Sequence, residues 1–178
     1  DLMRLQWDSQ FLNTRRKVVQ KKHARENLVF QRGVSQDAAY EEGKGTIVDI
    51  NSVESLRKAD ERVQKISRRI AQITADDTEH FPLICEGNKY RTHAKTKASQ
   101  QGIGYHGDSE RTRVMAMSVG GYEYPMQWVL FHRSKPRMEP ERVTLNSGDL
   151  YIMSELAVGQ EWKKSSLWTW RHAAGHEK

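Results

Sequence analysis

The clearest periodic pattern in the chain lies between residues 53 and 73, where apolar side chains recur every three or four positions. This spacing places them along one stripe of an amphipathic helix of about six turns, and most of the arginine and lysine side chains fall off the stripe. Ser52 is a plausible cap for the helix N-terminus. The pattern predicts a supporting helix that packs against a sheet through Val53, Leu56, Ala59, Val63, Ile66, Ile70 and Ile73.

Short β-branched and apolar runs dominate most of the remaining chain. Residues 46–50 have the composition of a strand, and after residue 81 similar runs follow one another without a helix between them. Gly, Pro, Asn and Ser turn signals separate these runs, which is typical of an antiparallel sandwich or barrel. The fold class is therefore predicted as α+β, with strands at 103–107, 113–119, 127–132, 142–145, 150–154 and 167–171.

The length of 178 residues predicts a single domain. We expect a basic N-terminal arm and loop over 1–45, a strand and support helix over 46–80, and the β core over 81–178. The apolar run at 128–131 is far shorter than the roughly 20 residues of a membrane helix, so no membrane partner is expected. One cysteine, Cys85, excludes an internal disulfide framework and a Cys-based zinc site, which favours the cytoplasm or nucleus.

Positive charge is concentrated at the N-terminus. The chain has a net charge of +6, and residues 1–32 hold eight Lys or Arg against three acids, which is +5. Trp7 and Phe11 are interleaved with these cations, so this arm could follow phosphates by charge and stack a base. The alternative is a solvated face whose aromatic side chains anchor it to the core.

A His-x-Asp motif carries the candidate chemistry. His106 and Asp108 are two residues apart, and positions i and i+2 of a strand point to the same face. With a second histidine from a distant strand they would form the two-His, one-carboxylate set of non-haem Fe(II) oxygenases, which leaves three metal positions open. Among His132, His172 and His176, we favour His172, because it ends a late strand and small alanines leave room beside it.

Four motifs follow one another along the chain: Asn88-Lys89-Tyr90, the His106-x-Asp108 strand, the Gly148-Asp149 turn, and His172 near the end of the fold. Together they resemble the Fe(II)/2-oxoglutarate-dependent dioxygenases, and within them the AlkB-like branch, whose Asn-x-Tyr element is similar to Asn88-Lys89-Tyr90. The likeness covers about residues 83–175. It implies a double-stranded β-helix (jelly-roll) core, iron as the metal, and 2-oxoglutarate and molecular oxygen as cosubstrates.

The resemblance implies His106, Asp108 and His172 as metal ligands. Predicted cosubstrate contacts are Asn88, Tyr90, Arg111, Tyr151 and Arg171. Arg111 could equally bind a phosphate or pair with a neighbouring acid.

The sequence departs from the family's pattern at one position. An arginine usually follows the distal histidine by eight to ten residues, whereas this chain ends six residues after His172. Arg171, Arg113 or Lys178 could replace that arginine. In a second register Arg171 takes its role, and the distal ligand then falls near Gln160, which is a poor iron ligand.

The implied activity is hydroxylation or demethylation of a nucleic-acid base, coupled to oxidative decarboxylation of 2-oxoglutarate. A base must be flipped out or already single-stranded to reach such a site. Five aromatic residues could stack on it, although we expect ordinary core packing for at least three of the five tryptophans. The alternatives are the same chemistry on a protein side chain or small molecule, a non-catalytic nucleic-acid-binding jelly-roll, and a cupin-like protein with another metal. The stacking candidates are Tyr105, Trp128, Trp162, Trp168 and Trp170.

Overall fold

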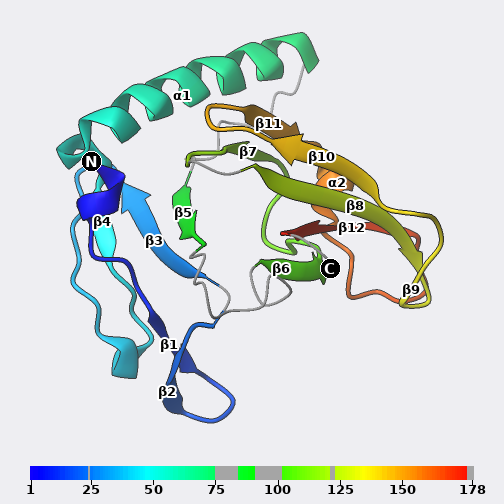
Figure 1. The fold of residues 1–178 in the computed structure, drawn as a ribbon, viewed down its shortest axis with the longest axis horizontal. Helices are drawn as coiled ribbons and strands as arrows, with labels where there is room; N and C mark the ends of the chain where they lie inside the picture. The colour runs from blue at the N-terminus through cyan, green and yellow to red at the C-terminus, as the bar shows by residue number, and fades with distance from the viewer. Residues whose placement is uncertain (24, 75–83, 91–101, 121–122, 176–178) are drawn as a thin grey trace. The chain divides into compact units, whose positions relative to one another are not determined.

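The structure is a computed structural model of the chain. It describes all residues except 24, 75–83, 91–101, 121–122 and 176–178 (Figure 1). The chain gathers into two compact units, residues 1–90 and residues 91–178, where the sequence predicted one domain. Both helices and strands are present, so the predicted α+β class is confirmed.

The first unit contains a three-stranded mixed sheet and a separate hairpin. Strand β3 is central, because β4 pairs with it in parallel and β5 pairs with it antiparallel. The first two strands form the hairpin. These elements are η1 (Leu2–Arg4), β1 (Gln10–Asn13), β2 (Val18–Lys21), β3 (Glu26–Gln31), η2 (Tyr40–Glu42), β4 (Ile47–Asp49), η3 (Ile50–Ser52), α1 (Glu54–Thr74) and β5 (Cys85–Lys89).

Most of residues 1–32, the segment predicted to be a basic arm, belong to folded elements of this unit. Leu28 and Phe30, two apart on β3, are buried with Ile50 in its core. Trp7 packs edge-on against Phe30 with ring centroids 6.4 Å apart. The alternative interpretation, in which Trp7 anchors this segment to the core, is confirmed for Trp7, whereas Phe11 is exposed.

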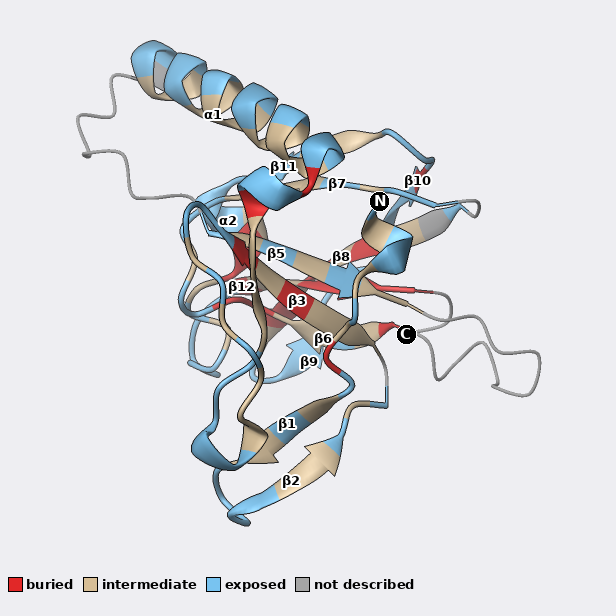
Figure 2. Cartoon of the chain, turned by 90° about the vertical axis from the view of Figure 1, so that its left-hand side faces the viewer, coloured by how far each residue is buried: buried red, intermediate tan, exposed pale blue. Residues whose placement is uncertain are grey.

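The predicted helix is confirmed as α1, although its start differs from the prediction. Ser52 does not cap it; its hydroxyl donates to the Asp49 carbonyl within η3. The apolar stripe becomes more exposed along the helix. Val53 is buried and Leu56 packs against the core, whereas Ile73 is 69% exposed. Figure 2 shows this gradient, with the polar side of α1 in pale blue.

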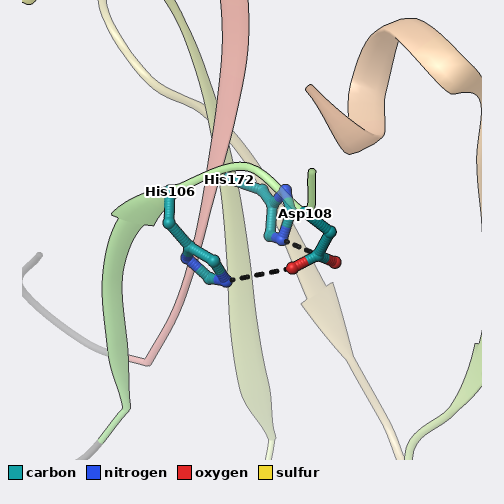
Figure 3. Close-up of side chains that lie close together, drawn as sticks. All are labelled: His106, Asp108 and His172. Atoms are coloured by element: carbon teal, nitrogen blue, oxygen red, sulfur yellow. Dashed lines mark ion pairs between the residues drawn. The ribbon is translucent and has the colours of Figure 1, made fainter. Parts of the chain in front are cut away.

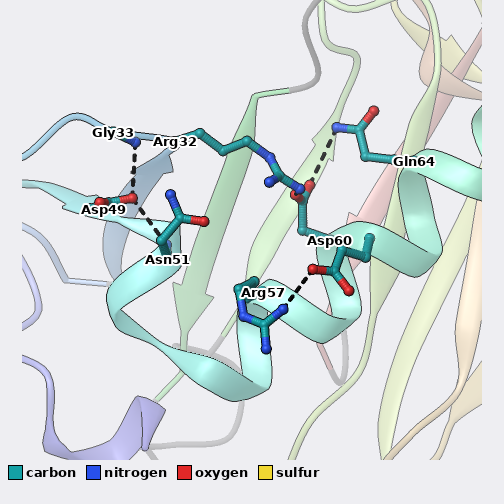
Figure 4. A network of polar contacts seen from close by, with 8 residues as sticks. Arg32, Gly33, Asp49, Asn51, Arg57, Asp60 and Gln64 are labelled. Atoms are coloured by element: carbon teal, nitrogen blue, oxygen red, sulfur yellow. Dashed lines mark hydrogen bonds and ion pairs between the residues drawn. The ribbon is translucent and has the colours of Figure 1, made fainter.

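Polar contacts join the start of α1 to the sheet of this unit. Asp60 on α1 pairs with Arg32, which directly follows β3 (Figure 4). At the end of β4, the Asp49 carboxylate accepts hydrogen bonds from the backbone N–H groups of Gly33 and Asn51, at 2.9 and 3.0 Å. These two donors lower the pKa of Asp49, because they stabilise its charged form.

The second unit consists of two antiparallel sheets. The larger has the order β10-β8-β12-β6, with β9 added to one end of β8, and the smaller pairs β11 with β7. All six predicted strands are found, the last shifted by two to three residues, whereas β9 and α2 were missed. The elements are β6 (Ile103–His106), β7 (Val114–Met117), β8 (Tyr124–His132), β9 (Lys135–Pro136), β10 (Glu141–Leu145), β11 (Leu150–Met153), α2 (Glu155–Val158) and β12 (Thr169–Ala174).

An apolar cluster lies on one face of the larger sheet. Met126, Leu145 and Ala174 are buried there, and Trp128 packs against them. Tyr151 from β11 joins the same cluster and meets Trp128 edge-on, with ring centroids 6.4 Å apart. The smaller sheet therefore contributes to the core that covers this face. Within the described part of the chain, no helix is long and apolar enough to cross a membrane.

Candidate metal centre

Strand pairing brings the two predicted histidine ligands together. In the antiparallel pair β6–β12, His172 lies directly opposite His106. Side chains that are directly opposite on one face of a sheet are nearest neighbours, and the two imidazole centroids are 4.4 Å apart. The Asp108 carboxylate lies beside both rings (Figure 3). The second histidine, which is far from His106 in the sequence, is therefore its direct neighbour on the adjacent strand.

The donor atoms of the three residues converge. The Nε2 atom of His106 lies 3.7 Å from Asp108 Oδ1, and the Nε2 atom of His172 lies 3.8 Å from Asp108 Oδ2. All three donor atoms lie within 4.8 Å of one another. Adjacent ligands on a metal with bonds of about 2.1 Å are roughly 3 Å apart, so small side-chain rotations would seat all three. The residues present therefore fit a divalent metal.

Hydrogen bonding sets the imidazole orientation that a ligand needs. His106 Nδ1 lies 2.8 Å from the Gly104 carbonyl, which accepts a hydrogen bond when that nitrogen carries the proton. This tautomer leaves the Nε2 lone pair free for a metal, as in most metal-bound histidines. The Gly104 carbonyl thus acts as the outer partner of this ligand.

His172 is held neutral by its surroundings. Burial is the main cause that lowers its pKa, and the nearby His106 lowers it further. The Asp108 charge and the Ala157 carbonyl act in the opposite sense but are weaker. A neutral imidazole is the form that binds a metal, so this environment prepares His172 for coordination.

Tight backbone contacts fix Asp108, and the sequence reasoning missed them. The Asp108 N–H donates to the Val158 carbonyl of α2 at 3.0 Å. A Cβ at Gly107 would lie 2.1 Å from the Gly159 carbonyl oxygen, so only glycine allows this approach. Gly159 itself ends α2 with a φ of +71°, a conformation that favours glycine. A Ser154 cap and a Gly159 end are helix signals that could have revealed this four-residue helix.

Arg111 is the outer partner of the carboxylate. Its guanidinium donates to Asp108 Oδ2 at 3.3 Å, and its backbone N–H donates to the Asp108 carbonyl at the same distance. Of the alternatives considered from sequence, pairing with a neighbouring acid is confirmed. A contact of Arg111 with the cosubstrate stays a prediction.

Arg171 lies on the face of β12 opposite to that of His172. Neighbouring residues of a strand point to opposite faces, so Arg171 points away from the face that carries His172. Its guanidinium lies over the Phe131 ring at 4.3 Å and donates to the Trp162 carbonyl at 3.0 Å. Burial lowers the pKa of Arg171. A role of Arg171 in binding a cosubstrate stays a prediction.

The other residues predicted to contact the cosubstrate are divided between the two units. Asn88 is on β5 of the first unit, opposite Asn27 of β3, and Tyr90 directly follows that strand. Burial raises the pKa of Tyr90. Tyr151 lies in the core cluster of the second unit. The roles of these residues in binding a cosubstrate stay predictions.

The structure also separates the candidate distal ligands. His132 is the last residue of β8, four residues beyond Trp128, which lies opposite His172, and its ring stacks on Trp168. His176 and Lys178 lie outside the described residues. Within the described part of the chain, His106, Asp108 and His172 are the one group of three side chains close enough to share a metal.

The first unit has an open hollow of about 530 Å³ that lysine and arginine side chains border. Lys22, Arg25 and Lys44 border it, together with the exposed Phe11. Burial lowers the pKa of Lys22, and the neighbouring Arg25 adds to this effect. The hollow is the surface of this folded unit on which the predicted phosphate contact can be tested.

Comparison with known proteins finds a viral relative of undetermined function. The chain is 36% identical over 178 residues to an uncharacterized protein of Acanthamoeba polyphaga mimivirus. The match includes 99% of this chain and 62% of that protein, so the chain spans less than two thirds of its relative's length. No family model matches the chain, and no solved structure matches it.

Proposed function

We propose that the protein is an Fe(II)/2-oxoglutarate-dependent oxygenase that hydroxylates or demethylates a nucleic-acid base. The observation that carries the proposal is the convergence of His106, Asp108 and His172 on one point. Two neutral imidazoles and one carboxylate are the donor set of non-haem Fe(II) oxygenases. Two antiparallel sheets with a shared apolar cluster support the finer assignment of a jelly-roll core.

The chemistry assigned to the metal is activation of dioxygen, with 2-oxoglutarate as the electron donor. The chain's own contribution is orientation and protection. The Gly104 carbonyl orients His106, and Arg111 holds the Asp108 carboxylate. The side chains of His172 and Asp108 are almost inaccessible to water, so these two residues shield their side of the candidate metal site from solvent.

A nucleic-acid substrate is supported by charge. The sequence pI is about 9.5, and residues 1–32 carry +5 of the net charge of +6. Lys22 and Arg25 of this segment border the hollow of the first unit. A basic surface attracts polyanions with an affinity that falls steeply with salt, which is the property to test first in any binding assay.

The deciding experiment is anaerobic absorption spectroscopy of the full chain. Addition of Fe(II) and then 2-oxoglutarate should produce a visible metal-to-ligand charge-transfer band. His106→Ala should abolish the band, whereas the matched His132→Ala variant should retain it. Methylated DNA and RNA oligonucleotides would then be screened for succinate release and loss of the methyl group.

Two results would count against the proposal. If the parent protein binds iron without forming the band, 2-oxoglutarate is not its cosubstrate. If the parent binds no iron at all, the three residues are not a metal site, and a non-catalytic nucleic-acid-binding protein becomes the better account.

A further inference from the structure

One tryptophan is on the surface of the protein. Trp168 is 59% exposed, whereas Trp7, Trp128, Trp162 and Trp170 are all half-buried. Its indole is stacked on the His132 ring, with centroids 4.6 Å apart and planes 5° from parallel. Exposure of so large an apolar ring loses the stabilisation that burial would give, so this arrangement is an informative exception to core packing.

This aromatic pair shares a face of the sheet with the metal ligands. In the pair β8–β12, Trp170 is opposite Leu130 and His172 is opposite Trp128. Because alternate residues of a strand share a face, His132 lies on the same face as Trp128 and His172. The ring stack places Trp168 on that face as well. We name His132 and Trp168 the aromatic platform.

The shared face becomes more exposed from the metal ligands to the platform. His172 is 4% exposed, Trp170 is half-buried, and Trp168 is exposed. Four residues of strand separate Trp168 from His172, which is about 13 Å at about 3.3 Å per residue. This distance corresponds to roughly four stacked bases at about 3.4 Å each. A strand that lies on the platform can therefore reach the triad with a few nucleotides.

Cations are frequent in the two segments that carry the platform, and Lys135 lies directly opposite His132 in the β8–β9 pair. The β8–β9 turn carries Arg133, and its N–H donates to the Ser165 carbonyl at 2.8 Å, which joins this turn to the loop before Trp168. Residues 132–139 and 161–168 together hold five Lys or Arg and two acids, a net charge of +3. The cations are all exposed: Arg133, Lys135, Arg137, Lys163 and Lys164.

The turn itself accepts an unfavourable backbone conformation. Arg133 and Ser134 have φ values of +51° and +58°, in a two-residue hairpin turn where Asn and Gly are the favoured residues. Arg133 directly follows His132, so this turn lies next to the platform in the chain.

We propose that the aromatic platform stacks a base of single-stranded nucleic acid whose phosphates are bound by Arg133, Lys135 and Lys163. An aromatic ring open to solvent and bordered by cations is the combination by which proteins bind single strands. A duplex offers no free base face to such a ring, so the partner is a single strand. The link to the metal site rests on the proposed function, whereas binding itself does not.

The test is fluorescence anisotropy of a short labelled single strand of mixed sequence, titrated with the metal-free full chain. Trp168→Ala should weaken binding roughly tenfold or more, because loss of base–aromatic stacking has effects of this size. Trp168→Phe should restore most of the affinity, since it retains an aromatic face. Leu167→Ala is the matched control, because Leu167 is the exposed apolar neighbour without a ring.

The charge contribution is measured separately. The double variant Lys135→Gln and Lys163→Gln should reduce the slope of log affinity against log salt by about 0.7 for each phosphate that is no longer neutralised. A labelled duplex of the same sequence should bind more weakly than the single strand. Thermal melts should match the parent for every variant, because each substituted side chain is exposed.

The proposal is overturned if Trp168→Ala binds the single strand as the parent does, or if Leu167→Ala loses as much affinity as Trp168→Ala. This outcome is distinguishable from failure of the oxygenase proposal. If the protein binds the single strand but forms no charge-transfer band, the platform proposal stands and the oxygenase proposal fails. If the band forms but the protein does not bind the strand, the iron chemistry stands and the platform proposal fails. The substrate should then be sought among proteins and small molecules.

Discussion

A methyl group at Gly107 tests whether backbone packing holds the candidate metal centre together. Gly107 lies between His106 and Asp108, and its Cα faces the turn that ends α2. A Cβ there would lie 2.1 Å from the Gly159 carbonyl oxygen and 2.8 Å from Cδ1 of Trp162. The oxygen belongs to the backbone, so it cannot rotate away as a flexible side chain would.

The magnitude follows from the required displacement. Ordinary contact begins at 3.4 Å, so the backbones must separate by 3.4 minus 2.1, or 1.3 Å. Functional sites tolerate displacements of only about 0.5 Å. We therefore expect Gly107→Ala to weaken metal binding at least tenfold, roughly the effect of losing an outer partner at other metal sites. Overpacking should also cost about 1–3 kcal/mol of stability.

The assay combines calorimetric titration of the metal-free protein with Co(II) and thermal unfolding followed by circular dichroism. Gly104→Ala is the matched control, because Gly104 lies on β6 just before Gly107 and its Cβ would meet nothing within 4 Å. The control should bind metal as the parent does and unfold at the same temperature or slightly higher. Parent-like metal affinity and melting temperature in Gly107→Ala would refute the reasoning.

Three further predictions concern single side chains. His172→Ala should lose metal binding in the same calorimetric titration, whereas His132→Ala should keep it; equal loss in both variants would show that the assigned ligand set is incorrect. Because burial lowers the pKa of His172 in the folded state, the unfolded chain takes up this proton first as the pH falls below about 6.5. The metal-free protein should therefore lose stability as the pH falls from about 7 toward the lower folded-state pKa, and urea unfolding of the parent and His172→Ala along this pH range would reveal a difference only if this histidine is responsible. Asp8→Ala should destabilise the first unit by about 1–3 kcal/mol, because the buried carboxylate accepts three hydrogen bonds at 2.6–2.9 Å whose donors would be left unpaired; the exposed Asp37→Ala is the control in urea unfolding, and similar midpoints for the two would contradict this account.

Local pattern predicted most regular elements of the second unit and the helix of the first. The strands were visible because β-branched and apolar residues alternate with turn residues over short distances. The hairpin β1–β2 was missed because each of its strands is only four residues long and contains just two apolar residues. Its charges suggested an arm, while the burial of Trp7 and Leu28 that folds this segment depends on residues far along the chain.

The pairing of His106 with Asp108 could be inferred from their spacing alone, because residues two apart at a strand end point to the same side. The alternation of side chains along a strand likewise predicts that Arg171 and His172, which are consecutive, point to opposite faces. The choice of His172 as third member, by contrast, depends on the register of β12 against β6, which exists only in the folded chain. Close backbone contacts at Gly107 and Gly159 support this arrangement, and they join segments about fifty residues apart that leave no periodic signal in the sequence.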